Sequence, residues 1–296
     1  MAIYVTGDTH GIHPYGLGSV DGFMHRLSTT VFPEQKQMTK EDYVIILGDF
    51  GGVWYTDRHS SQESSEERYA LDWLESKPFT TLFVPGNHEN YDRLMGCYDE
   101  RLLSSWFFSA MPEVEKEKLR HGYPRKPWHG GYVRQIRPSV LMLERGDIFE
   151  IDAQYCFAFG GAQSHDISDG ILDPTTFPDE TRFKKEYQRR RGELVRVRGL
   201  SWWAEELPSA EEMAHGRETI QTFLSNHERI DFVFTHDAPA SDKVLFGYEA
   251  EDPLTLYLEE LRHWMRYGKW FYGHLHQNRR LSDTQFLLYE QIVRIH

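Results

Sequence analysis

Short runs of aliphatic, β-branched and aromatic residues recur along the chain, and they predict buried β-strands. Between them lie polar stretches that contain glycine, proline, aspartate or asparagine, which is typical of turns and loops. The runs occupy residues 3–6, 43–47, 81–84, 140–143, 148–151, 155–160, 232–235, 269–272 and 286–290. The hydrophobic pattern therefore predicts a protein built around sheets of short strands.

Three helices are predicted from the residues at their ends. Two of them begin with a serine followed three residues later by glutamate, the capping-box pattern, and the third begins with an aspartate directly before a proline. Glycine after the last apolar position ends the third helix. The capping residues are Ser64 with Glu67, Ser209 with Glu212, and Asp252 with Pro253, and the closing glycine is Gly268.

The order of these elements indicates a mixed α/β protein. Strands alternate with helices in the first hundred and the last eighty residues, while residues 145–160 are predicted to form an antiparallel meander. This order favours a layered α/β sandwich. Residues 96–135 and 163–208 do not fit the pattern, and we expect them to be insertions or long loops.

Composition and charge exclude several classes of protein. A net charge of -13 argues against bulk binding to nucleic acid or to membranes, but it does not exclude a local basic patch. Two cysteines are too few for a disulfide framework or a cysteine zinc site. No apolar stretch reaches the roughly 20 residues that span a bilayer, and no basic region precedes a long apolar segment near residue 1. We therefore predict a cytoplasmic protein without a membrane partner.

Five of the predicted strands are followed at once by residues that can bind a metal. The carboxyl ends of parallel strands meet at one edge of a sheet, so these residues are expected to converge. They are Asp8 and His10 in GDTHG, Asp49 in GDFGG, Asn87, His88 and Glu89 in GNHEN, His236 in THDAP, and His274 and His276 in GHLH.

Taken alone, each motif has an ordinary structural explanation: a polar turn, a surface loop, or a histidine hydrogen-bonded in the core. Taken together at five strand ends, they predict a site for two divalent ions. Two neighbouring ions need a bridging carboxylate, and Asp49, alone in its motif, suits that position. Nitrogen and oxygen ligands without sulfur favour Mn, Fe, Zn or Ni over Mg or Ca, and we favour Mn²⁺.

The five blocks follow the pattern D-x-H, G-D, G-N-H-[ED], H and G-H-x-H, and in this the chain resembles the calcineurin-like metallophosphoesterases. The resemblance extends from Gly7 to His276. It implies a four-layer α-β-β-α sandwich of two mixed sheets, with the metal site at the carboxyl ends of the strands. Residues 1–296 are accordingly predicted to form a single domain that carries the two insertions.

The resemblance also implies a role for each matching residue. Asp49 would bridge the two ions, and a metal-bridging hydroxide would attack phosphorus. His88 would lie near the leaving group, either as general acid or as charge stabiliser. The remaining ligands would be Asp8, His10 and His276 for the first ion and Asn87, His236 and His274 for the second.

One block departs from the family's protein Ser/Thr phosphatases, which continue it as G-D-x-x-D-R-G. Here Gly52 stands at the position of the aspartate and Val53 at that of the arginine. Asp57 and Arg58 follow slightly later, either as a substitute or as a solvated loop pair. The departure argues against a phosphoprotein phosphatase of that type and favours a phosphoesterase of bacterial or phage type.

Two basic stretches are candidates for substrate binding. Residues 182–198 contain eight arginines and lysines, Arg189, Arg190 and Arg191 among them, and form either a patch that steers phosphate or nucleic acid or a solvated face. Arg125 lies among aromatic residues that could stack on a base, or in an ordered surface loop.

These observations predict a dinuclear metal-dependent phosphoesterase that hydrolyses phosphomonoester or phosphodiester bonds. The expected substrate is a phosphorylated small molecule, a nucleotide or a phosphoprotein. The alternatives are a nuclease that uses residues 182–198, and a non-catalytic scaffold with the same fold.

Overall fold

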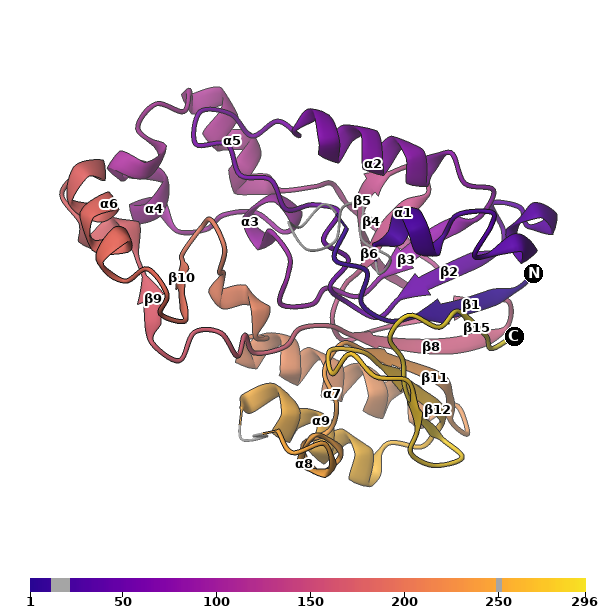
Figure 1. Ribbon diagram of the computed structural model, residues 1–296. Helices are drawn as coiled ribbons and strands as arrows, with labels where there is room; N and C mark the ends of the chain where they lie inside the picture. The colour runs from indigo at the N-terminus through magenta and orange to yellow at the C-terminus, as the bar shows by residue number, and fades with distance from the viewer. Residues whose placement is uncertain (12–21, 249–251) are drawn as a thin grey trace.

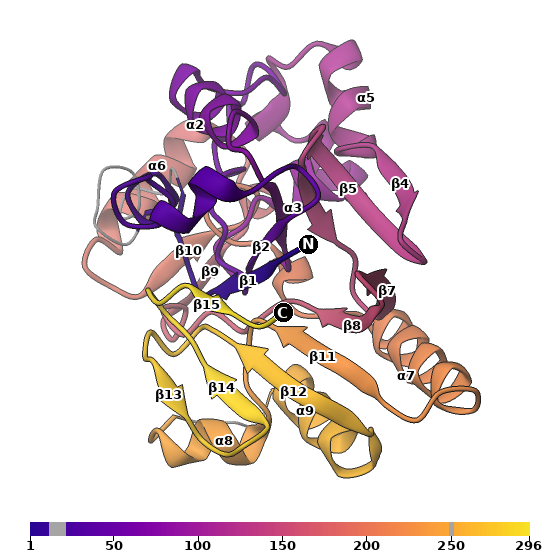
Figure 2. The same cartoon turned by 90° about the vertical axis from the view of Figure 1, so that its right-hand side faces the viewer.

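The computed structural model describes residues 1–11, 22–248 and 252–296, and in it two β-sheets lie face to face with helices on both outer faces (Figures 1 and 2). Helices α1 and α2 cover the first sheet, and α7, α8 and α9 cover the second. The predicted four-layer α-β-β-α sandwich is confirmed.

The first sheet has seven strands in the order β15-β1-β2-β3-β6-β5-β4. Strands β1, β2, β3 and β6 are parallel neighbours, and antiparallel strands complete both edges. The strands are β1 Ile3–Thr6, β2 Tyr43–Ile46, β3 Thr80–Phe83, β4 Arg125–Trp128, β5 Gly131–Arg137, β6 Val140–Leu143 and β15 Val293–Arg294.

The second sheet has six strands in the order β13-β14-β12-β11-β8-β7. Strands β8, β11, β12 and β14 run parallel, while β7 pairs with β8 as the predicted antiparallel meander. The strands are β7 Asp147–Ile151, β8 Gln154–Phe159, β11 Ile230–Thr235, β12 Tyr267–Tyr272, β13 Arg279–Arg280 and β14 Gln285–Leu287.

The central strands of each sheet are mostly apolar because they are buried on both faces. In β2, Ile45 points into the core between the sheets, whereas Ile46 packs under the helices of the first sheet. In β12, Phe271 faces the same central core and Trp270 packs under the helices of the second sheet. Successive side chains of a strand point to opposite faces, so a short unbroken apolar run supplies two hydrophobic layers.

The capping residues predicted from the sequence begin their helices. Ser64 and Ser209 accept hydrogen bonds from the backbone N–H of Glu67 and Glu212, and Asp252 accepts from the first turn of α9. Gly268 does not close α9, because the helix ends earlier and Gly268 lies within β12. The helices of the sandwich are α1 Phe23–Arg26, α2 Ser65–Glu75, α3 Tyr91–Leu94, α7 Ala210–Leu224, α8 Ala240–Leu245 and α9 Pro253–Trp264, with a 3₁₀ turn at Pro33–Gln37.

The two stretches expected to be insertions or loops contain regular structure, and they pack on each other. The Trp106 indole donates to the carbonyl of Pro174, and its ring contacts that of Phe183. The end of the first stretch, residues 125–135, forms strands of the first sheet instead of a loop. The other elements here are α4 Glu100–Ser104, α5 Glu113–His121, α6 Glu180–Arg189, β9 Gly170–Leu172, β10 Val195–Val197, and 3₁₀ turns at Trp106–Phe108, Pro174–Thr176 and Ala204–Glu206.

Among the described residues, no helix has the length and apolarity needed to cross a membrane. The assignment of residues 1–296 to one domain and the cytoplasmic location both stay predictions.

Candidate metal centre

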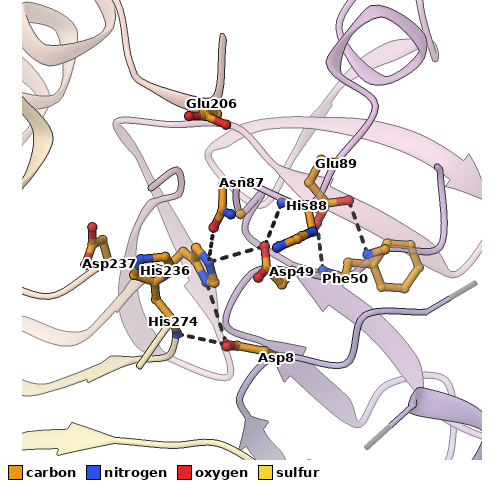
Figure 3. Close-up of polar contacts among 12 residues, drawn as sticks. Asp8, Asp49, Phe50, Asn87, His88, Glu89, Glu206, His236, Asp237 and His274 are labelled. Atoms are coloured by element: carbon orange, nitrogen blue, oxygen red, sulfur yellow. Dashed lines mark hydrogen bonds and ion pairs between the residues drawn. The ribbon is translucent and has the colours of Figure 1, made fainter. Parts of the chain in front are cut away.

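The loops after β1, β2, β3, β11 and β12 meet where the two sheets come together, and they bring the predicted ligands into one cluster. Figure 3 shows five of these ligands, Asp8, Asp49, Asn87, His236 and His274. Three of these strands belong to the first sheet and two to the second, so the cluster lies across both. Most of its side chains are buried, while His88 and His274 are half-buried and His276 is exposed. The seven residues proposed as ligands from the sequence therefore lie together.

Asp49 lies at the centre of the cluster. Its Oδ2 is 3.3 Å from Nε2 of His10, and its Oδ1 is 3.3 Å from Nε2 of His236. Two groups of three residues could each hold an ion: Asp49 with His10 and His276, and Asp49 with His236 and His274. Asp49 belongs to both groups, which is the arrangement that a bridging carboxylate requires.

Asp8 and Asn87 extend these two groups. Asp8 Oδ2 lies 3.0 Å from Nε2 of His276, while Asp8 Oδ1 accepts the backbone N–H of His274 at 3.0 Å. On the other side, Oδ1 of Asn87 lies 3.3 Å from Nε2 of His236. Each group thus gains one oxygen donor, while the assignment of these residues to two separate ions stays a prediction from the family resemblance.

The orientation of His236 fits a cation in the second group. Its Nδ1 lies 2.7 Å from the carbonyl oxygen of Leu47, which can only accept, so Nδ1 carries a proton. Nε2 faces Oδ1 of Asp49 and Oδ1 of Asn87, two further electron-pair donors. Burial opposes protonation of the ring, but the charge and hydrogen bond of Asp49, the charge of Asp8 and the Leu47 carbonyl together raise the pKa of His236 to about 10. A divalent ion would occupy the place of that proton.

His274 is suited to bind a cation for a different reason. Burial lowers the pKa of its imidazole to about 4, so the ring is neutral at physiological pH and has a free electron pair. Nitrogen and oxygen donors without sulfur, as found here, fit Mn, Fe, Zn or Ni.

The backbone at the cluster is held in an uncommon conformation. His10, Asp49, His274 and His276 have φ angles of 48°, 43°, 66° and 48°. Residues other than glycine rarely adopt such angles, and the strain is typical of functional sites whose surroundings force the geometry. Four of the seven proposed ligands therefore depend on the rest of the fold for their position.

Glu89, which follows His88 in its motif, supports the loops and lies outside both proposed ligand groups. It is fully buried and accepts hydrogen bonds from the backbone N–H groups of Phe50 and Gly51, at 2.7 and 3.3 Å. These contacts tie the loop after β3 to the loop that carries Asp49.

Gly86 allows the backbone after β3 to approach Asp49 closely. A Cβ atom at this position would lie 2.2 Å from Oδ1 of Asp49 and 2.3 Å from its backbone nitrogen. We therefore expect Gly86→Ala to displace Asp49 and to reduce both bound metal and activity by at least about tenfold. Elemental analysis and hydrolysis assays would measure this. Gly247→Ala is the control: its φ of 81° is also strained for alanine, but a Cβ there meets nothing within 4 Å, so metal content should stay at the wild-type level. Full metal content in the Gly86 variant would contradict the prediction.

The arginines proposed to bind substrate are not brought to this cluster. Arg58 pairs with Glu180 at 2.9 Å, and Arg125 pairs with Glu144 at 2.7 Å and lies over the ring of Tyr132. Helix α6 and the turn after it carry Arg189, Arg190 and Arg191 on a segment far from the ends of β1, β2 and β3 (Figure 1).

The basic stretch is also largely neutralised by acidic residues. Glu180 contacts Lys184, Glu186 contacts Arg189, and Glu193 contacts Arg190. Further along, Arg198 pairs with Asp173 and with Asp99. Surface ion pairs of this kind leave little net field, so the structure gives no support to a patch that attracts nucleic acid.

Three residues near the cluster were not singled out from the sequence. Ser164 Oγ lies 3.5 Å from Nδ2 of Asn87 and donates to Glu206 at 2.7 Å. Arg196 approaches His88. A single serine or glutamate in a polar segment carries no signal, and Arg196 was one of eight basic residues in its stretch.

A cleft of about 1450 Å³ opens onto the cluster. Asp49, Asn87 and His88 lie at its base, residues 163–168 contribute to one wall, and α8 contributes to another. A phosphate ester can therefore reach the predicted ligands between these two walls.

Two sheets pack face to face, and their strand ends carry two groups of nitrogen and oxygen donors around a shared aspartate. This arrangement is typical of phosphoesterases of the layered α/β class. The chain belongs to the calcineurin-like phosphoesterase family, which matches residues 1–278. The protein is therefore a member of a family of phosphate-ester hydrolases, as the motifs indicated.

No curated protein is significantly similar in sequence to this chain. One solved structure that matches is that of a Staphylococcus aureus protein described as "Putative 5'-Nucleotidase", in complex with alpha-ketoglutarate. The two chains are 14% identical with a TM-score of 0.42, and the match covers 97% of this chain and 48% of the other. The chain thus spans about half the length of that protein.

Proposed function

We propose that the protein hydrolyses phosphate esters with the help of two divalent metal ions. The observation that supports this most strongly is the position of Asp49, which is buried and shared by the two groups of possible ligands. Asp8, His10 and His276 would hold one ion, and Asn87, His236 and His274 the other. When bound, the pair of ions would supply a water-derived nucleophile and neutralise charge on the phosphoryl group.

The remaining chemistry falls to residues of the chain. The backbone N–H of His88 donates to Oδ1 of Asp49 at 2.8 Å, which fixes the carboxylate, while the His88 ring faces the cleft. We assign this ring to the leaving-group side of the site, as general acid or charge stabiliser. The bridging Asp49 and His88 are therefore the proposed catalytic residues.

The proposed substrate is a phosphorylated small molecule. Arg58, Arg189 and Arg190 are paired with carboxylates, and α6 lies away from the cluster, which argues against the nuclease alternative. Gly52 and Val53, in place of the aspartate and arginine of the protein phosphatases, argue against a phosphoprotein. A scaffold without activity would have little need to keep all seven ligands in this geometry.

Removal of metal is the direct test. Protein treated with a chelator is expected to lose hydrolysis of p-nitrophenyl phosphate and of bis(p-nitrophenyl) phosphate, because the bare site lacks its nucleophile. Adding Mn²⁺ should restore it better than Fe²⁺, Zn²⁺ or Ni²⁺. The relative rates on the two esters separate a monoesterase from a diesterase. Unchanged activity in protein shown by elemental analysis to be metal-free would refute the proposal.

A further inference from the structure

Arg196 on β10 lies in the basic stretch of residues 182–198, but its side chain is not on the surface. It is 8% exposed, and it reaches from the second inserted segment to the base of the cleft. Its Nε pairs with Asp166 Oδ1 at 2.7 Å, and its Nη1 donates to Ser164 Oγ and to the Ser201 carbonyl, both at 3.2 Å. Its Nη2 lies 3.4 Å from Nε2 of His88.

This last contact restricts the state of the His88 ring. A guanidinium group has donors only, so Nε2 of His88 must be the acceptor. An imidazole whose Nε2 accepts is neutral and carries its proton on Nδ1. The contact with Arg196 thus selects both a ring orientation and one of the two neutral tautomers.

The position of Arg196 also bears on the aspartate and arginine that the second sequence block lacks relative to the protein phosphatases. Val53, at the position of the family's arginine, is fully buried in the apolar layer beneath α2, and Gly52 has no side chain to offer. Neither residue can support His88. The guanidinium of Arg196 reaches His88 instead, from a strand more than a hundred residues further along the chain.

We propose that Arg196 is the positioning residue of His88, and that the segment of residues 163–208 serves to bring it there. This inference rests on the proposed function only in that His88 acts on the ester. Asp166 and Ser164 bind Nε and Nη1 of the guanidinium, and Nη2 contacts the imidazole of His88. Arg196 is therefore expected to affect turnover through His88 and not through substrate binding.

Arg196→Gln tests this in the full-length protein. With Mn²⁺ and p-nitrophenyl phosphate, kcat should fall about 10–100-fold, while KM changes less than about threefold. In a His88→Gln background the same substitution should cost less than about twofold, because its partner is already gone. Arg198→Gln is the matched control: it lies two residues away on the same segment, but its partners are Asp99 and Asp173. Its kcat should stay within about twofold of wild type.

A second readout needs no turnover. Long-range ¹H–¹⁵N spectra of the histidine rings in the metal-free protein distinguish the two neutral tautomers, and His88 should carry its proton on Nδ1 in wild type and lose that preference in Arg196→Gln. If the wild type hydrolyses no ester, the proposed function fails while the ring spectra still decide this inference.

Three results would overturn the inference: an equal fall in kcat with and without His88, a rise in KM alone, or an unchanged His88 tautomer in Arg196→Gln. If that variant does not fold, Asp166→Asn is the substitute test. Asp166 is partly exposed, and without its charge it would bind the guanidinium of Arg196 less tightly. This substitution should shift kcat and the ring spectrum in the same direction, and wild-type behaviour would equally refute the proposal.

Discussion

Asp49→Asn is expected to lower hydrolysis of p-nitrophenyl phosphate by at least about a thousandfold. Asparagine has nearly the same size, so the loop can keep its shape, but the negative charge shared by both groups of ligands is lost. An amide can also offer only one oxygen, and its NH₂ group would face a histidine nitrogen. Metal content measured by elemental analysis should fall together with kcat.

A matched substitution separates this effect from a general loss of charge. Asp57 lies on the loop that follows, where its carboxylate accepts the backbone N–H of His59 at 2.9 Å. Asp57→Asn should keep activity within about twofold of wild type, because this residue is not part of either ligand group. Wild-type turnover in Asp49→Asn would exclude the proposed mechanism.

Arg145→Met is expected to lower the free energy of unfolding by about 3–5 kcal/mol. The guanidinium is buried and donates to the carbonyls of Gly160, Glu205 and Glu206 at 2.8, 2.8 and 3.2 Å, and to the Tyr91 hydroxyl at 2.9 Å. Methionine fills similar space but leaves these oxygens without their donor. Chemical denaturation would measure the loss.

The control for this prediction is an arginine at the surface. Arg217 pairs with Glu260 at 2.6 Å, and both side chains are partly exposed. Arg217→Met should cost less than about 1 kcal/mol because solvent screens such a pair. Equal losses in the two variants would show that the contacts of Arg145 do not stabilise the fold as inferred.

The cluster of possible ligands was predictable because each motif directly follows a strand. Strand position follows from short-range hydrophobic pattern, and parallel strands carry the residues after their ends to a common edge. Asp8 and His276 could therefore be placed together although they lie at opposite ends of the sequence. No comparable rule places Arg196, because it lies in a segment whose path depends on packing against residues 96–122.

The surface charge of the insertions was unpredictable for a related reason. Arg58 contacts Glu180, and Arg198 contacts Asp99, across separations of 122 and 99 residues. Only the folded chain shows that Glu180 also contacts Arg58, and that Arg198 at the end of the basic stretch is paired with two acids outside it, Asp99 and Asp173. Strand β4 was missed because Arg125–Trp128 is an edge strand with exposed polar residues and a proline, which do not form an apolar run.

The place of the candidate centre at the junction of the sheets has a consequence for the thermodynamics of the protein. Ligands from both sheets would contribute to each of the two proposed metal ions, so metal binding would link two layers that also share an apolar core. Any ligand that binds only the folded chain stabilises it, by about 2.7 kcal/mol at a hundredfold excess over its dissociation constant. Metal supply would then affect the fraction of the protein that stays folded as well as the rate at which the protein hydrolyses its substrate.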